Sequence, residues 1–360
     1  MTTIRAAVCT AFGQDLRIEE LDLRAPAPGE VQVRLDAVAI CHSDISYIDG
    51  GWGGTLPAVY GHEAAGRIEA VGDGVLGFGV GQKVLVTLIR SCGQCAPCGG
   101  GAPVYCSGNA ARDPALRMSD GTPVEKAMEC GAFAEAVVVD QSQLAPLPDD
   151  LSADVACLLS CGVITGIGAV VNTARVRPGQ NVVVVGAGGV GLNAIQGARI
   201  AGAARIVAVD LSQAKLDDAT AFGATDGVLA VAADPWQEVH RITGGAMADA
   251  VFVTVGAIPA YEQAMRYLGR GGMVYAVGMP HSGDTAIYEP VTIASVGHGM
   301  KGSKMGDAVL RRDIPWMVDL YRQGRLKLDE LVSDRWRLDQ INEAIAHTRA
   351  GKARRNVIVF

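Results

Sequence analysis

The chain has 360 residues, of which 49% are hydrophobic and 19% are charged, and its formal net charge is −7. This length exceeds one ordinary core and predicts two domains in a globular protein. The acidic balance argues against a nucleic-acid partner, and neither the N-terminus nor the apolar run at residues 182–185 is long enough for a signal peptide or a membrane span. We therefore expect a cytoplasmic protein with reduced thiols, no membrane contact and no nucleic-acid partner.

The first part of the chain, up to about residue 160, is predicted to be rich in β-strands. Short β-type runs lie between Gly, Pro and Asp turns at residues 31–40, 66–71, 83–86 and 134–139. Two groups of metal-binding side chains lie between or after these runs. The first group predicts a closed zinc site by its spacing, whereas the second is a set of candidate ligands for an open one.

The first group is a cluster of four cysteines in a glycine-rich stretch, Cys92, Cys95, Cys98 and Cys106, with the spacing C-x2-C-x2-C-x7-C. Four thiolates can surround one tetrahedral Zn²⁺ with no open position, which is the arrangement of a structural site. The alternative is a set of free thiols or disulfides, but Cys-x2-Cys pairs share a metal more readily than they form a disulfide. We expect loss of the metal to unfold this loop.

The second group, Cys41, His62 and Cys161, is spread along the chain. Two thiolates and one imidazole leave one tetrahedral position for water or substrate, as in catalytic zinc sites. Each residue alone has a simpler interpretation, because a lone cysteine is most often a small core residue and a lone histidine a hydrogen-bonded one. Spacing alone does not select these three residues.

From residue 181 the pattern changes to alternating strands and helices, which predicts a parallel sheet covered on both faces. Two amphipathic helices and a final strand close the chain. The expected strands are 181–186, 205–210, 250–255, 273–278 and 356–360, and the expected helices are about 189–201, 212–222, 259–268, 314–323 and 339–348.

A G-x-G-x-x-G loop joins the first of these strands to the following helix. Its glycines allow a tight turn and the close approach of a pyrophosphate to the helix N-terminus. Asp210 ends the next strand, where a carboxylate binds the adenosine ribose and repels a 2′-phosphate, so the pattern favours NAD over NADP; Lys215 can reach the same ribose. The alternative is a glycine turn without a ligand. The loop residues expected at the cofactor are Gly186, Gly188, Gly189, Val190 and Gly191.

The stretch from Gly61 to Val75, GHEAAGRIEAVGDGV, resembles the signature of the zinc-containing alcohol dehydrogenases of the medium-chain dehydrogenase/reductase superfamily. The cysteine cluster, the glycine loop and the C-terminal segment follow in that family's order, so the resemblance covers essentially the whole chain. It implies an α/β fold with a GroES-like β-rich catalytic domain, residues 1–162 and 304–360, and a Rossmann doubly wound parallel-sheet domain, residues 163–303.

The resemblance also implies roles for individual residues. It makes Cys41, His62 and Cys161 the ligands of the catalytic zinc, Asp44 the carboxylate that orients the histidine, and Glu63 a carboxylate behind the metal. Ser43 corresponds to a hydroxyl that touches both substrate and cofactor. Ser46 stands where many relatives carry a proton-relay histidine, and a serine cannot act as a base near neutral pH. The implied cofactor contacts are His42, Thr165, Val277, Gly278, Met279 and Arg355.

The implied activity is hydride transfer from a primary or aromatic alcohol to NAD, giving the aldehyde. The implied assembly is a homo-oligomer, a dimer rather than a tetramer, with two Zn²⁺ per subunit. Trp52 and Leu88 match positions that line the substrate pocket in this family. The alternative for Trp52 is a packing residue under a glycine-rich loop.

Two other functions remain open from the sequence. Residues 109–122 and 311–331 look similar to mycothiol-dependent formaldehyde dehydrogenases, so the first alternative is NAD-dependent oxidation of S-(hydroxymethyl) thiol adducts. Ala110 and Trp52 stand where the glutathione-dependent branch carries charged residues, which argues against that thiol. The second alternative is a non-catalytic zinc and dinucleotide-binding protein, such as a redox-sensing regulator, which has no need for an open zinc beside Ser43 and Asp44.

Overall fold

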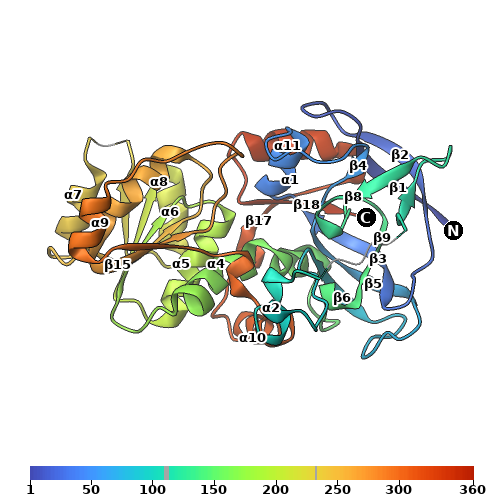
Figure 1. The fold of residues 1–360 in the computed structure, drawn as a ribbon, viewed down its shortest axis with the longest axis horizontal. Helices are drawn as coiled ribbons and strands as arrows, with labels where there is room; N and C mark the ends of the chain where they lie inside the picture. Colours follow the sequence, from blue (N-terminus) through green and yellow to red (C-terminus); the bar gives the residue numbers. More distant parts are fainter. Residues whose placement is uncertain (109–112, 232) are drawn as a thin grey trace. The chain divides into compact units, whose positions relative to one another are not determined.

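The computed structural model describes residues 1–108, 113–231 and 233–360. The chain forms two compact units. Unit 1 comprises Met1–Cys161, Val309–Gln323 and Leu328–Phe360, and unit 2 comprises Gly162–Ala308 and Gly324–Lys327. Figure 1 shows that the ends of the chain both belong to unit 1, which is therefore built from segments far apart in the sequence.

Unit 1 is built on two β-structures whose inward side chains form one apolar core. The predicted strands 66–71 and 83–86 are confirmed within β5 and β6, and the predicted strands 31–40 and 134–139 correspond to β3 and β9 with ends shifted by one or two residues. A closed barrel has the order β1 (Thr2–Cys9), β2 (Arg17–Leu23), β7 (Leu116–Arg117), β8 (Pro123–Lys126) and β4 (Ala58–Val59). A second sheet has the order β10 (Leu144–Pro146), β6 (Lys83–Thr87), β5 (Glu63–Val71), β3 (Glu30–Ala39), β18 (Arg355–Val359) and β17 (Val332–Trp336), and β9 (Ala136–Asp140) also pairs with β3.

The pairing of β3 with β5 is tight enough to require a glycine. A Cβ atom on Gly66 would lie 2.0 Å from the Arg34 carbonyl oxygen, so only a residue without a side chain fits there. This antiparallel register places Ala39 opposite Glu63. The loop that follows β3 therefore meets the segment that leads into β5.

Unit 1 has five α-helices among its described residues, of which α10 is the longest. They are α1 (His42–Ile48), α2 (Ala96–Gly99), α3 (Ala153–Ala156), α10 (Leu310–Arg322) and α11 (Ile341–Arg349). The last two confirm the amphipathic helices predicted near the C-terminus. Among the described residues no single helix is long and apolar enough to cross a membrane; one bent pair, 153–160 with 162–174, passes by length and composition only.

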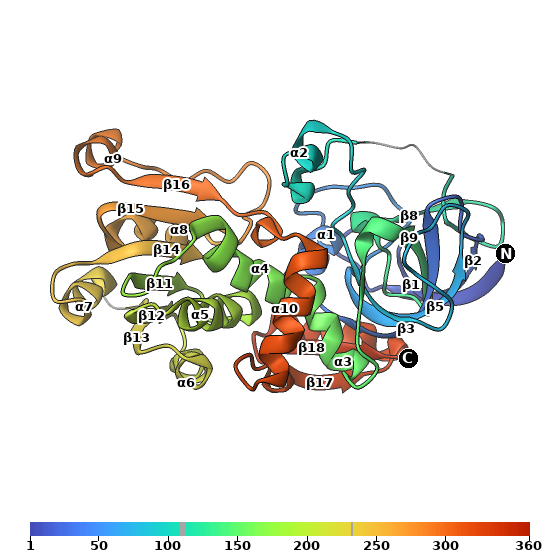
Figure 2. The same ribbon diagram turned by 90° about the horizontal axis from the view of Figure 1, so that it is seen from below.

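Unit 2 is a six-stranded sheet in which every pair is parallel. Its order is β13 (Asp226–Leu229), β12 (Arg205–Asp210), β11 (Asn181–Val185), β14 (Ala248–Val253), β15 (Leu268–Ala276) and β16 (Gly299–Gly302). Its helices are α4 (Gly162–Gly168), α5 (Gly189–Ala201), α6 (Gln213–Phe222), α7 (Pro235–Ile242), α8 (Ile258–Ala264) and α9 (Pro290–Val296). The predicted alternation and parallel sheet are confirmed, and Figure 2 shows β16 at the outer edge.

Several elements of unit 2 differ from the sequence-based expectation. The predicted helix 259–268 ends at Ala264, a 3₁₀ turn follows, and β15 begins at Leu268, five residues before the expected strand. The glycines at 269, 271 and 272 obscured this part of the strand, because glycine is unfavourable in β-structure. Helix α4 was not expected either. Its glycine-rich sequence is explained by close packing, since a Cβ on Gly166 would lie 2.4 Å from the Val190 carbonyl oxygen of α5.

Candidate metal centres and dinucleotide site

Four buried side chains of unit 1 place their ligand atoms within 4.8 Å of one another: Cys41, His62, Glu63 and Cys161. Cys41 caps the N-terminus of α1 directly after β3, and His62 precedes the first residue of β5. The β3–β5 register described above brings these segments together. Cys161 follows a short 3₁₀ turn and arrives from a third segment.

Asp44 fixes the orientation of the imidazole. Its Oδ1 lies 2.9 Å from Nδ1 of His62 and accepts the Gly61 N–H at 2.9 Å, while its Oδ2 accepts the Cys41 N–H at 3.0 Å. With Nδ1 bonded in this way, Nε2 carries the lone pair that a metal needs.

Nε2 of His62 is buried and has no hydrogen-bond partner among the described residues. Proteins rarely leave a buried polar atom in this state, and metal ligands are a common exception. Two thiols complete the donor set. The neighbouring Cys161 thiol, helped by the charges of His62 and Arg355, holds the pKa of the Cys41 thiol well below its usual range and outweighs the effect of burial. The residues therefore fit a Zn²⁺ bound by two sulfurs and one imidazole.

Glu63 and Arg355 form a buried ion pair beside this cluster. Arg355 Nη1 lies 3.3 Å from Glu63 Oε1 and 3.4 Å from the Ile40 carbonyl oxygen. Neither Glu63 oxygen has a hydrogen-bond partner among the described residues. Burial raises the pKa of Glu63 to about 8, although Arg355 opposes the rise. The resemblance implies that a glutamate at this position can approach the metal, and a Glu63 oxygen lies within 4.8 Å of the other donor atoms.

The other predicted residues of this part of unit 1 lie on α1. Ser43 Oγ is 3.6 Å from Cys41 Sγ, so its hydroxyl sits beside the proposed metal ligands. Ser46 is half-buried and His42 is exposed. Arg355, which the resemblance places at the cofactor, pairs with Glu63 at the distance given above, and its contact with a cofactor stays a prediction.

The four-cysteine cluster also forms as a group, with its sulfur atoms within 4.8 Å of one another. Backbone N–H groups point at the sulfurs: Cys92 N–H donates to Cys106 Sγ at 3.3 Å, and Cys95 N–H donates to Cys92 Sγ at 3.4 Å. Hydrogen bonds from the backbone at Cys98 and Ser107 lower the pKa of Cys95 to about 5. These contacts favour a thiolate at Cys95, and the four sulfurs together fit a closed Zn²⁺ site. The structure joins none of the nine cysteines in a disulfide.

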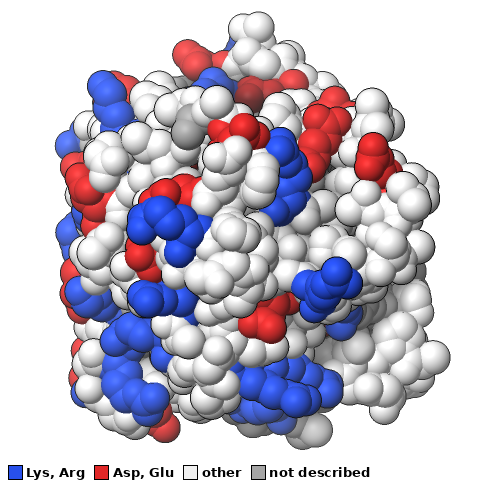
Figure 3. Space-filling model, turned by 90° about the vertical axis from the view of Figure 1, so that its left-hand side faces the viewer, with Lys and Arg blue, Asp and Glu red and all other residues white. Residues whose placement is uncertain are grey.

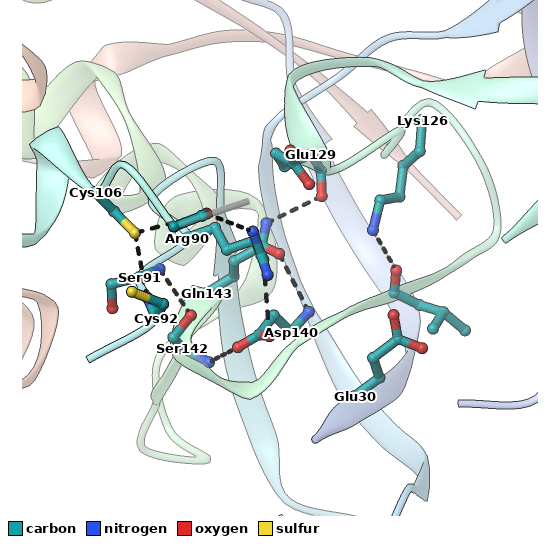
Figure 4. A network of polar contacts seen from close by, with 12 residues as sticks. Glu30, Arg90, Ser91, Cys92, Cys106, Lys126, Glu129, Asp140, Ser142 and Gln143 are labelled. Atoms are coloured by element: carbon teal, nitrogen blue, oxygen red, sulfur yellow. Dashed lines mark hydrogen bonds and ion pairs between the residues drawn. The ribbon is translucent and has the colours of Figure 1, made fainter. Parts of the chain in front are cut away.

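A polar network that the sequence did not reveal ties this loop to the rest of unit 1 (Figure 4). Arg90 donates to the Gly108 carbonyl at 3.3 Å and pairs with Asp140 at 3.8 Å. The Ser91 N–H donates to Ser142 Oγ at 3.0 Å. Buried Gln143 donates to the carbonyls of residues 87 and 129 at 2.9 and 3.0 Å. No local sequence motif predicts these contacts, because most of them join segments that are distant in the sequence.

The glycine loop of unit 2 has the form expected for phosphate binding. It lies at the carboxyl end of β11, where Gly186 has a φ of 94° and Gly188 caps the 13-residue helix α5. A Cβ on Gly191 would lie 1.8 Å from the Gly186 carbonyl oxygen. Asp210, at the end of β12, accepts the Ala187 N–H at 2.8 Å and the Ser212 N–H at 3.0 Å. The carboxylate is thus fixed beside the loop, while Gly189 and Val190 lie in the first turn of α5 and Lys215 lies on α6.

The remaining predicted cofactor residues of unit 2 lie at two places. Residues 277–279 follow β15 at the same carboxyl edge of the sheet, where the N–H groups of Val277 and Gly278 both donate to the Val253 carbonyl, at 3.0 and 2.8 Å. Thr165 is buried in α4, with its hydroxyl 3.7 Å from Met305 Sδ.

The proposed substrate-pocket residues both lie in unit 1. Trp52 is half-buried after α1 and meets Tyr47 edge-on, with ring centroids 5.0 Å apart. Tyr47 in turn stacks on buried Tyr60 at 6.0 Å. Leu88 is partly buried and packs against the core of unit 1. Asn109 and Ala110, which belong to the segment similar to thiol-adduct enzymes, lie outside the described residues.

Comparison with known proteins gives consistent similarities over the whole chain. Residues 27–149 match the alcohol dehydrogenase GroES-like domain family, and residues 189–323 match the zinc-binding dehydrogenase family. The chain is 35% identical to an alcohol dehydrogenase class-3 from Cereibacter sphaeroides, over 99% of both chains. It is 34% identical to an S-(hydroxymethyl)glutathione dehydrogenase from Paracoccus denitrificans, again over 99% of both. Among solved structures, benzyl alcohol dehydrogenase from Acinetobacter calcoaceticus shares 30% identity with a TM-score of 0.94, over 100% of both chains.

Proposed function

Because this chain belongs to the zinc-containing alcohol dehydrogenases of the medium-chain dehydrogenase/reductase superfamily, and so is an oxidoreductase acting on CH–OH donors, we propose that it oxidises primary or aromatic alcohols with NAD. The reaction takes an alcohol and NAD⁺ to the aldehyde, NADH and a proton. The proposal includes two Zn²⁺ per subunit and a cytoplasmic location, since reduced thiols are typical of that compartment. The non-catalytic alternative is not retained for a member of this enzyme family.

The observation that carries the proposal is the partnerless Nε2 of His62, buried among the thiols of Cys41 and Cys161 in the described part of unit 1. A Zn²⁺ held there would supply Lewis-acid chemistry to the alcohol oxygen. Asp44 keeps Nδ1 protonated and the imidazole in place. Ser43, whose hydroxyl lies beside Cys41, would receive the hydroxyl proton of the substrate. A serine passes a proton on through hydrogen bonds and does not store it, so the proton leaves through further hydroxyls or water.

A substrate panel tests this proposal directly. We expect NAD reduction with benzyl alcohol to be faster than with ethanol, because the Tyr47–Trp52 pair offers an aromatic wall at a position that lines the pocket in the family. The assay measures NADH formation at fixed pH with either NAD or NADP. Absence of turnover with every alcohol in zinc-loaded protein would contradict the proposal.

The thiol-adduct reaction is kept as a second candidate, because relatives of equal similarity carry that name. Half-buried Trp52, at a position where the glutathione-dependent branch carries a charged residue, offers no charge to a peptide carboxylate. Formaldehyde with and without glutathione, and with and without mycothiol, separates the two functions. A thiol-dependent rate that exceeds the benzyl alcohol rate would favour the second candidate.

The choice of NAD rests on Asp210. We expect Asp210→Ser to weaken NAD binding by about ten-fold or more, the effect of losing a hydrogen bond to a charged group, and to improve the use of NADP. Steady-state KM values for the two cofactors measure the change. Asp249→Ser is a matched control: Asp249 also accepts a backbone N–H, from Asn181 at 2.7 Å, but it lies at the amino-terminal edge of the sheet. Equal effects of the two substitutions would refute the assignment.

We also propose that two copies join along β16. This strand pairs only with β15 in the described sheet, so its other edge is open to a second copy of the same strand. Large apolar side chains are exposed nearby: Ile287 by 82%, Val291 by 71% and Met300 by 40%. In the view from the side of α7 and α9, wide areas without charge separate the charged side chains (Figure 3).

A charge placed on this edge tests the dimer. We expect Met300→Asp to convert a dimer into a monomer, because a desolvated carboxylate opposes strand pairing across a two-fold axis. Light scattering coupled to size exclusion measures the mass. Leu76→Asp, at an exposed site of unit 1, should leave the dimer intact. If Met300→Asp remains a dimer, the two copies do not join along β16.

A further inference from the structure

Residues 277–279, called the carboxamide strip because the family resemblance places them along the nicotinamide carboxamide, are anchored on one side by the end of β14. Two N–H groups of the strip donate to the Val253 carbonyl, as described above. A Cβ on Gly278 would lie 2.5 Å from backbone atoms of Val255, and one on Gly256 would lie 2.3 Å from the Met279 carbonyl oxygen. The strip therefore lies directly on the backbone of residues 253–256.

The other anchor is the side chain of Tyr261. Its hydroxyl donates to the Gly278 carbonyl oxygen, and the residue is 7% exposed within the core of unit 2. Burial, with a smaller effect of Tyr288, raises the pKa of Tyr261 to about 12, so the hydroxyl remains a donor at neutral pH. Neither the family motif nor the periodicity of α8 assigns any role to this residue.

Two anchors on one strip fix the direction of its remaining peptide groups. The C=O and N–H of a trans peptide point in opposite directions in one plane. Since the Gly278 carbonyl points at Tyr261, the Met279 N–H points away from it. Since the Gly278 N–H points at Val253, the Val277 carbonyl points away from β14. The strip thus holds one donor and one acceptor in set directions, which is what a carboxamide, itself one acceptor and one donor group, requires.

We propose that Tyr261 is a positioning residue for the cofactor, whose hydroxyl sets the carboxamide strip so that it recognises the amide of the nicotinamide ring. This proposal rests on the NAD-dependent function proposed above. The pyrophosphate site has its own anchor: the Thr254 hydroxyl donates to the Gly186 carbonyl oxygen at 2.8 Å and so holds the glycine loop. Loss of the Tyr261 hydroxyl should therefore affect the nicotinamide end alone.

The test compares Tyr261→Phe with two other variants of unit 2. Tyr267→Phe is the matched control, because Tyr267 is 1% exposed in the same core but its hydroxyl contacts the Gln263 side chain at 3.3 Å. Thr254→Val removes the anchor of the glycine loop. For each protein, fluorescence and calorimetry give the Kd of NADH, of the reduced 3-acetylpyridine analogue, which has a methyl ketone in place of the amide, and of ADP-ribose, which has no nicotinamide.

For Tyr261→Phe we expect NADH and the acetylpyridine analogue, which both carry the carbonyl that meets the Met279 N–H, to bind about five-fold more weakly, the effect of one hydrogen bond, while the Kd of ADP-ribose stays within about two-fold. The preference for NADH over ADP-ribose should thus shrink. Tyr267→Phe should leave all three values unchanged, and Thr254→Val should weaken all three together.

An unchanged Kd of NADH in Tyr261→Phe, or an equal loss for ADP-ribose, would overturn the proposal. Failure of the proposed function gives a different result. A wild-type chain that binds dinucleotides but oxidises no alcohol contradicts the function and still allows this comparison. A wild-type chain that binds neither dinucleotide contradicts both.

Discussion

Replacing His62 with alanine is expected to lower kcat/KM for alcohol oxidation by at least about a thousand-fold, because Lewis-acid assistance contributes several kcal/mol to such a reaction. The physical basis is the geometry of the cluster. His62 supplies the only nitrogen donor of this group, and its Nε2 has no other partner among the described residues. The loss of this ligand leaves two buried thiols and a carboxylate.

Two measurements besides activity accompany this variant. Elemental analysis should show the zinc content falling from two to one per subunit, and NADH should bind with an unchanged Kd, because the glycine loop and Asp210 belong to the other unit. Asp44→Asn serves as the graded control. It keeps the shape of the side chain, removes the charge on the His62 hydrogen bond and should cost only about ten- to a hundred-fold in activity or metal affinity. Near-normal turnover of a His62→Ala protein that holds one zinc would refute the assignment of the catalytic metal.

Replacing Cys106 with alanine is expected to act on stability rather than on chemistry. Cys106 receives the Cys92 N–H and lies 3.9 Å from Cys95 Sγ, so its loss opens the closed donor set. Without its metal, the loop holds little apolar material: residues 91–103 include no buried position. We expect a Tm lower by roughly 10 °C, faster proteolysis of the loop and one zinc lost per subunit.

The Cys106→Ala substitution is expected to leave the catalytic zinc site unaffected. The intact fraction of Cys106→Ala should retain the zinc at His62 and a kcat within about three-fold of the wild-type value, because the two donor sets share no residue. Cys9→Ala is the matched cysteine control: Cys9 is buried in β1, outside both clusters, and its removal should leave the zinc content at two. An unchanged Tm and unchanged protease resistance of Cys106→Ala would show that the cluster does not hold the loop.

The network in Figure 4 explains why the loop should unfold locally and not take unit 1 with it. Arg90, Asp140 and Gln143 join the ends of the loop to strands and turns that carry their own apolar core. The body of unit 1 therefore keeps its packing when the metal is lost. Only the fold of the segment beyond Ser91 depends on the bound metal.

Structural features that depend on a short stretch of the chain could be predicted from the sequence. The cysteine spacing from 92 to 106, the glycine loop and the strand runs of β3 and β5 each depend on neighbours within a few residues. Local backbone conformation and ligand spacing suffice for them, because steric limits and coordination geometry act over that range. The catalytic donor set needed the family resemblance, since Cys41, His62 and Cys161 are too far apart for spacing to select them.

The tertiary structure alone decided which distant groups meet. The β3–β5 register places Cys41 against His62, strand β18 delivers Arg355 to Glu63, and the fold of unit 2 sets Tyr261 on the carbonyl of Gly278. These contacts depend on strand register and helix packing across long separations, and no local pattern encodes which of many apolar faces will pair. The sequence therefore determined the kinds of site that this protein holds, and the packing of its chain determined the residues that orient them.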